Sequence, residues 1–118
     1  MARKQGHNKA LFEQKIKNEI NIALRRTIAD PRLTMVSVTR VELTADYSHA
    51  KVYWDTYDSS KRGDIKKALD GISSKLRSIL AKELEVRHTP HLELFYDSQI
   101  EDELYIENLL AKSSSDDD

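Results

Sequence analysis

Residues 36–56, VSVTRVELTADYSHAKVYWDT, decide the fold because they contain two runs in which apolar and polar residues alternate. The first run slips in phase at Arg40 and then resumes, which predicts a β-bulge or a twist in a strand. A polar turn follows at residues 46–48, and the second run, residues 50–57, predicts a strand antiparallel to the first. Together the two runs predict a hairpin with one buried face.

Amphipathic helical regions are predicted on both sides of this hairpin. In residues 11–28, apolar residues recur at steps of three and four, and Pro31 disfavours any continuation of the helix. In residues 65–84, the same spacing predicts a second helical region, which Ser59 or Ser60 could cap. Each region therefore has one apolar stripe to pack against the hairpin.

Small residues interrupt the second helical region. Gly71, Ser73 and Ser74 are poor helix formers that permit a bend. The sequence therefore predicts a kinked helix pair with its bend near residues 71–74.

The last part of the chain adds one more strand and an acidic end. Leu92, Leu94 and Tyr96 alternate with other residues and predict a short third strand. The helix pair is long enough for this strand to lie parallel to the second one. Apolar residues between positions 100 and 110 predict a short C-terminal helix, and residues 111–118 are too polar to pack, which predicts an acidic disordered tail.

These elements, in the order α-β-β-α-α-β, predict an α+β fold with three main helices on one face of a mixed three-stranded sheet. A chain of 118 residues with 39% hydrophobic residues has the common size of one domain, which we place at residues 1–110. No apolar run reaches the ~18 residues of a membrane span, no cysteine is present, and no apolar stretch follows residues 1–8. We therefore expect a cytoplasmic protein without disulfides or a secretory signal.

The formal net charge of −1 conceals a separation of charge along the chain. Through Pro90 there are 18 Lys and Arg against 11 Asp and Glu, a balance of +7, whereas from His91 onward there is one Lys against nine acids, a balance of −8. Phosphate groups respond to the local field, which extends over about 8 Å at physiological salt. A near-neutral net charge therefore does not exclude a nucleic-acid partner.

The cations are concentrated in two clusters. One follows the polar face of the first helix into the turn after it, and the other lines the helix pair. Side chains of this kind contact phosphate groups without reading bases. Solvation of exposed helix faces is the alternative explanation for both clusters, and the charge separation favours a polyanionic partner.

Residues that could support catalysis or bind a metal do not form a complete set. His88 and His91 have a spacing that could suit a metal ion, but Pro90 lies between them and no cysteine or third histidine completes the site. The acidic run 101–103 is better explained by the preference of helix N-termini for negative charge. Because no nucleophile or phosphate-binding glycine motif is present either, we expect no enzymatic activity, no cofactor and no metal.

Short motifs in a fixed order connect this sequence to a known family. They are Asp30-Pro31-Arg32 after the first helix, Ala50-Lys51-Val52-Tyr53 in the hairpin, Leu76-Arg77 in the helix pair, and Pro90, Leu92, Phe95 and Asp97 around the last strand. Through them the chain resembles the ribosome-binding factor A family, over most of its length. The resemblance implies a type II KH-like fold, in which a kinked helix pair replaces the G-x-x-G loop of standard KH domains. The family's Ala-x-Gly kink corresponds here to Ile72, Ser73 and Ser74.

The resemblance also implies a function. A member of this family would bind the immature small ribosomal subunit and its ribosomal RNA, and would support late rRNA processing and cold adaptation. We expect it to act as a monomer, with no small-molecule substrate and no membrane partner. By position, the expected RNA contacts are Arg3, Lys4, Lys15, Arg25, Arg26, Arg32, Lys66, Lys67, Lys75 and Arg77.

Two other functions stay open at this point. A non-catalytic protein-interaction module could bind a basic partner, such as a ribosomal protein, through the acidic C-terminal segment. A hydrolase that uses the acidic run 101–103 or the pair His88 and His91 has less support, because neither group is complete.

Overall fold

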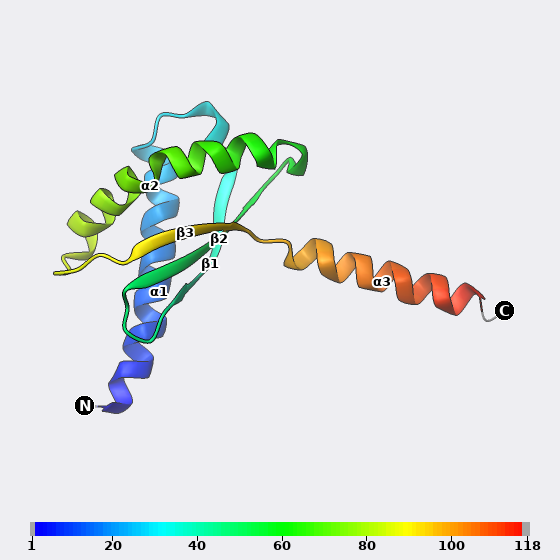
Figure 1. Cartoon of the computed structure of the whole chain (residues 1–118), viewed down its shortest axis with the longest axis horizontal. Coiled ribbons are helices and arrows are strands. Elements are labelled where there is room, and N and C mark those ends of the chain that lie inside the picture. Colours follow the sequence, from blue (N-terminus) through cyan, green and yellow to red (C-terminus); the bar gives the residue numbers. More distant parts are fainter. Residues whose placement is uncertain (1, 117–118) are drawn as a thin grey trace.

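The computed structural model describes residues 2–116, with side chains described in 8–58, 60–98 and 102–111. Six main elements follow one another along the chain (Figure 1). They are α1 (Ala2–Arg26), β1 (Val36–Leu43), β2 (His49–Thr56), α2 (Arg62–Leu84), β3 (His91–Tyr96) and α3 (Gln99–Asp116), with short 3-10 turns η1 (Pro31–Leu33) and η2 (Ser59–Lys61).

The three strands form one mixed sheet in the order β1-β2-β3. β1 and β2 are antiparallel, and β2 and β3 are parallel, as the length of the crossover predicts. The register of β1 against β2 shifts between Val38 and Arg40, so the interruption predicted at Arg40, a bulge or a twist, is confirmed as an irregularity of the strand. One face of the sheet carries Ala50, Val52 and Trp54, which are all buried.

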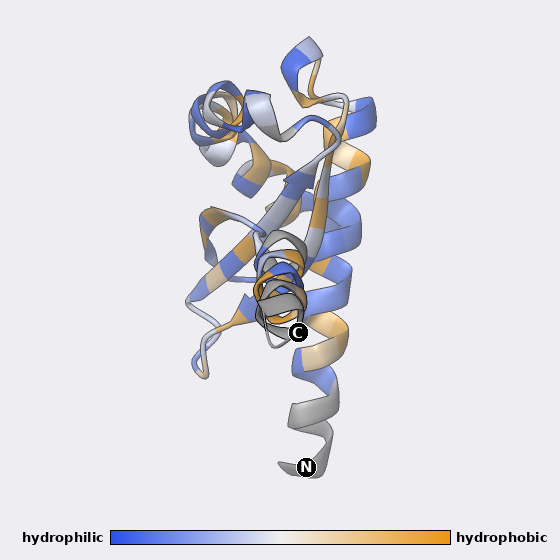
Figure 2. Cartoon of the chain, turned by 90° about the vertical axis from the view of Figure 1, so that its right-hand side faces the viewer, coloured by the Kyte–Doolittle hydropathy of each residue, from blue (hydrophilic) through white to orange (hydrophobic). Residues whose placement is uncertain are grey.

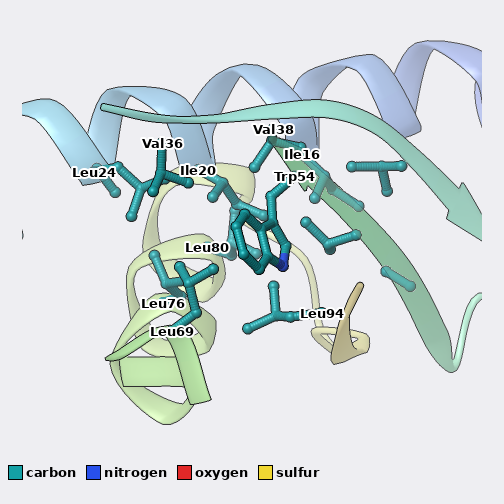
Figure 3. Close-up of a cluster of buried hydrophobic side chains, with 14 of the residues drawn as sticks. Ile16, Ile20, Leu24, Val36, Val38, Trp54, Leu69, Leu76, Leu80 and Leu94 are labelled. Atoms are coloured by element: carbon teal, nitrogen blue, oxygen red, sulfur yellow. The ribbon is translucent and has the colours of Figure 1, made fainter. Parts of the chain in front are cut away.

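The core lies between this face and the helices α1 and α2. Figure 3 shows Ile16 and Ile20 of α1 on one side of the Trp54 indole and Leu80 of α2 on another. Trp54 is only 1% exposed, and the Tyr96 ring packs edge-on against it at 5.2 Å between centroids. The predicted α+β fold, with helices on one face of a mixed three-stranded sheet, is confirmed.

The second helical region is continuous. α2 runs from Arg62 to Leu84 as one helix, and the ribbon changes direction part-way along it (Figure 1), so the predicted helix pair is present as two halves of α2. The predicted capping by Ser59 or Ser60 is wrong. Lys61 is the N-cap and makes no side-chain capping bond, while the Ser60 backbone N and Oγ donate to the carboxylate of Asp58 at 3.0 and 2.7 Å.

The C-terminal helix is longer than expected. α3 extends to Asp116, so helical structure continues into 111–118, the segment predicted to be disordered, and the domain boundary at residue 110 stays a prediction. α3 projects away from the rest of the molecule (Figure 1), which spans 61 × 41 × 18 Å. Within the described part of the chain, no helix is long and apolar enough to cross a membrane.

Candidate nucleic-acid interface

The outward side of α1 presents two free cations. Lys15 and Arg26 are eleven residues apart, which places them about 20° apart around a helix. Both are exposed, and neither has a hydrogen bond or ion pair with any described residue. Most of the coloured part of the α1 ribbon is hydrophilic in Figure 2. The ammonium group of Lys15 and the guanidinium group of Arg26 are therefore available to a polyanion.

Arg25, the neighbouring cation, is attached to the sheet edge. Its Nη2 donates to the Ser37 Oγ of β1 at 3.0 Å, because Arg25 lies further round the helix on the side of β1. The guanidinium stays exposed, so it remains able to contact phosphate. Arg3 and Lys4 belong to the first turns of α1, and their side chains lie outside the described residues.

Two of the predicted contacts on α2 are free cations. Lys67 and Lys75 are exposed, and neither contacts a partner among the residues with described side chains. Lys66 differs, because its Nζ lies 3.0 Å from Asp70 one turn further along. An exposed pair of this kind is weak, so the charge of Lys66 is partly compensated but not locked in place.

Arg32 is held by the residue that caps the η1 turn. Its Nε and Nη2 donate to the Asp30 carboxylate at 3.1 and 2.8 Å, and its backbone N donates to the same carboxylate at 2.9 Å. The hydrogen bonds from Arg32 lower the pKa of Asp30, and the Asp30 carboxylate raises the pKa of Arg32. The Arg32 side chain is still 57% exposed, so the pair fixes its direction without burying it.

Arg77 also stabilises the fold, through hydrogen bonds to the backbone. Its Nε and Nη2 donate to the Thr89 carbonyl at 3.3 and 3.0 Å, which ties α2 to the loop before β3. Arg77 is half-buried, unlike the other candidates whose side chains are described.

The two sides of the molecule therefore differ. α1 and α2 cover one face of the sheet, the helical side (Figure 1), and the free cations Lys15, Arg26, Lys67 and Lys75 are exposed residues of these two helices. The acids of α3 do not cover this side, because α3 points away and its described side chains from 102 to 111 are exposed. The structure thus leaves a cationic surface on α1 and α2 open to solvent.

The other face of the sheet carries a group that sequence reasoning missed. The Arg40 guanidinium lies 3.9 Å from the centroid of the Tyr53 ring, and the Tyr53 and Phe95 rings lie side by side, tilted by 32°, with centroids 5.7 Å apart. Arg40 also pairs with Glu42 and Asp97 at 2.9 and 3.7 Å, so its charge is compensated. The alternation of residues in β2 and β3 indicates that the Tyr53 and Phe95 rings face away from the helices. The contact between the two rings could not be predicted, because it depends on which strands are neighbours in the sheet.

No metal site is found among the described residues. His91 lies beside His49 of β2, with ring centroids 5.3 Å apart, because the two residues are register partners in the sheet. His88 lies in the loop that follows α2.

Comparison with known proteins agrees with this architecture. The family model described as "Ribosome-binding factor A" matches residues 8–110, which is most of the chain. The chain belongs to the ribosome-binding factor A family. Ribosome-binding factor A of Heliobacterium modesticaldum is 40% identical to it over 114 residues, which cover 96% of this chain and 94% of that protein.

Solved structures of ribosome-binding factor A share the fold. The crystal structure of the Thermus thermophilus protein has a TM-score of 0.67 and 28% identity, over 75% of this chain and 93% of that one. A homology model of the Thermus thermophilus protein, fitted into a cryo-EM map of its complex with the 30S subunit, has a TM-score of 0.63 and 26% identity. It covers 76% of this chain and 96% of that chain. The resemblance carried by the sequence motifs is therefore confirmed.

Proposed function

We propose that this protein is a non-catalytic assembly factor that binds the immature small ribosomal subunit through the cationic side of α1 and α2. It contacts ribosomal RNA there, acts as a monomer in the cytoplasm, where the subunit is assembled, and supports late rRNA processing and growth in the cold. Membership of the ribosome-binding factor A family supports the partner, as does the 30S complex of the Thermus thermophilus relative.

The observation that carries the proposal is the set of free cations on the helical side. Lys15, Arg26, Lys67 and Lys75 are exposed and have no partner among the described residues. Cations of this kind bind RNA by neutralising phosphates and releasing counterions, which makes binding sensitive to salt. A folded scaffold that holds them in place needs no catalytic group to stabilise one RNA conformation.

Sedimentation with ribosomal particles tests this function. Tagged protein is mixed with small subunits and with small-subunit precursors at low salt and is then separated on a sucrose gradient. We expect co-sedimentation with the small subunit, stronger for precursors, and release as salt is raised. Absence of the protein from every small-subunit fraction at low salt would reject the proposal.

A second candidate function rests on α3. Its described side chains are exposed, including Tyr105, Ile106, Leu109 and Leu110, and its charged residues before position 112 are all acidic. Figure 2 looks along this helix and shows hydrophobic and hydrophilic colours mixed around it. An exposed helix with apolar and acidic residues fits a basic protein surface with an apolar groove, such as that of a ribosomal protein.

Truncation separates the two candidates. A chain that ends at residue 98 keeps the helical side intact and lacks α3. Under the RNA-binding function, binding to naked ribosomal RNA and to the precursor both persist or rise, because the lost segment is net acidic. Under the α3 function, binding to RNA is unaffected, whereas binding to a complete precursor that carries its ribosomal proteins is lost.

A further inference from the structure

A hollow of about 430 Å³ lies where the second half of α2 meets the loop before β3. Ser74 and Ser78 of α2 line one wall, with Arg77 between them on the same helix, and Arg87 and His88 of the loop line another. Neither Arg87 nor His88 belongs to the set of RNA contacts predicted from the sequence.

The loop that presents Arg87 and His88 is held in place from both ends. At its start, Glu85 has φ 52° and ψ 40°, the left-handed conformation that ends α2 and turns the chain (Figure 1). At its end, Thr89 accepts the two hydrogen bonds from Arg77, and the Pro90 that follows is buried. The walls of the hollow are therefore organised before any ligand arrives.

The polar groups of the hollow share one chemical preference. Arg77, Arg87 and His88 supply N–H donors, Ser74 and Ser78 supply hydroxyl groups, and no carboxylate is among the lining residues. Arg87 and His88 have no hydrogen bond or ion pair with any described residue, and Arg77 uses only Nε and Nη2 in its bonds to Thr89. Several N–H and O–H donors without a neighbouring acid fit a phosphate group, and arginine offers the planar fork that phosphate oxygens accept.

We propose that this hollow binds a backbone phosphate of ribosomal RNA, with Arg87 as its main ligand and His88 and the two serine hydroxyls as additional donors. The assignment rests on the proposed RNA-binding function and extends its interface from the outer sides of α1 and α2 to the loop before β3. Arg77 both lines the hollow and holds the loop, so its two roles cannot be separated by substitution.

Two variants test the hollow without disturbing Arg77. Arg87→Ala removes the main ligand, and Ser78→Leu fills the hollow at an exposed helical position while leaving every charge in place. Lys51→Ala is the matched control, because Lys51 is an exposed cation of β2 that alternates with the buried residues Ala50 and Val52 and therefore faces away from the helices. The three variants and the wild type are titrated with a labelled small-subunit RNA fragment over a range of salt.

We expect Arg87→Ala to weaken RNA binding about five- to tenfold at ~0.1 M salt and to lower the salt slope by about one unit, as loss of one phosphate contact does. Ser78→Leu should weaken binding as well, and Lys51→Ala should bind like the wild type. Wild-type affinity and slope in both hollow variants would overturn this assignment while leaving the proposed function intact. A wild-type protein that binds no RNA would reject both the phosphate site and the proposed RNA-binding function.

NMR with inorganic phosphate identifies the source of the ligand. The His88 ring signals are followed while RNA, or inorganic phosphate alone, is added. A shift with RNA at micromolar concentration that is absent in Arg87→Ala supports the backbone assignment. Saturation by inorganic phosphate together with no response to RNA would identify a site for small anions and would overturn it.

Discussion

Loss of three free cations should change how binding to the small subunit depends on salt. The perturbation is the triple variant Lys15→Ala, Arg26→Ala and Lys75→Ala, chosen because these exposed side chains have no partner among the described residues and their removal breaks no contact of the fold. Each phosphate contact contributes a slope of about 0.9 for a duplex and about 0.7 for a single strand in log K against log salt. Three contacts therefore correspond to about 2.1–2.7 units.

That slope converts into a measurable difference. When salt rises fourfold, from about 50 to about 200 mM, the wild type should lose about 20- to 40-fold more affinity than the triple variant. Fluorescence anisotropy with a labelled small-subunit RNA fragment gives the dissociation constant at each salt concentration, and circular dichroism checks that the variant is folded. Lys51→Ala, on the opposite side of the sheet, should keep the wild-type slope. A triple variant that also keeps it would refute the argument that α1 and α2 face the RNA.

Three further predictions concern stability. Trp54→Ala should cost about 3–5 kcal/mol in urea unfolding, because the ring is 1% exposed in the core; Trp54→Phe should cost less, since it keeps a ring and removes an indole N–H that has no partner in the described structure. Gly71→Ala should raise the free energy of unfolding, measured in urea, by about 0.5–1 kcal/mol, because a Cβ there meets nothing within 4 Å and the glycine is helical; an unchanged or lower free energy would mean that the bend in α2 requires the glycine. Hydrogen bonds from Ser48 and Thr44 lower the pKa of Asp46 from 3.8 to about 2, so its ionised form stabilises the folded state above about pH 4. Asp46→Asn should therefore be less stable than the wild type at pH 7, and the difference should disappear as the pH falls towards 2; a difference that is constant with pH would contradict this.

Most of the fold could be predicted because its signals are local in the sequence. The alternation in residues 36–56 predicted both strands of the hairpin, and its slip in phase predicted the irregularity at Arg40. The helical spacing of residues 65–84 lies within α2, Arg62–Leu84. The predicted start of the second helix was wrong, because two turns compete for the same residues. Ser60 donates its backbone N–H to Asp58 within a 3-10 turn, and α2 starts only after this turn. Polar residues can form either turn, so composition does not distinguish them.

The candidate site was less predictable, because the availability of a cation depends on tertiary contacts. Arg25 meets Ser37 across 12 residues, and Arg77 meets the Thr89 carbonyl across 12 residues. Nothing in the residue types distinguishes these two arginines from Arg26, which remains free. Arg87 was missed for the converse reason, since a single arginine in a loop shows no pattern until the loop folds beside α2.

The position of α3 explains how a chain with a net charge of −1 can present a cationic surface. Its 18 residues extend about 27 Å at ~1.5 Å per residue, and Figure 1 shows this helix leading away from α1 and α2. Screening at physiological salt limits the effect of an exposed charge to about 8 Å. Three acids, Glu101, Asp102 and Glu103, lie in the first turns of α3, and Glu107 lies further along it. Because the helix leads away from α1 and α2, it does not cover the side on which Lys15, Arg26 and Lys75 are exposed. Net charge adds these two regions together, whereas an RNA phosphate at the helical side meets only one of them.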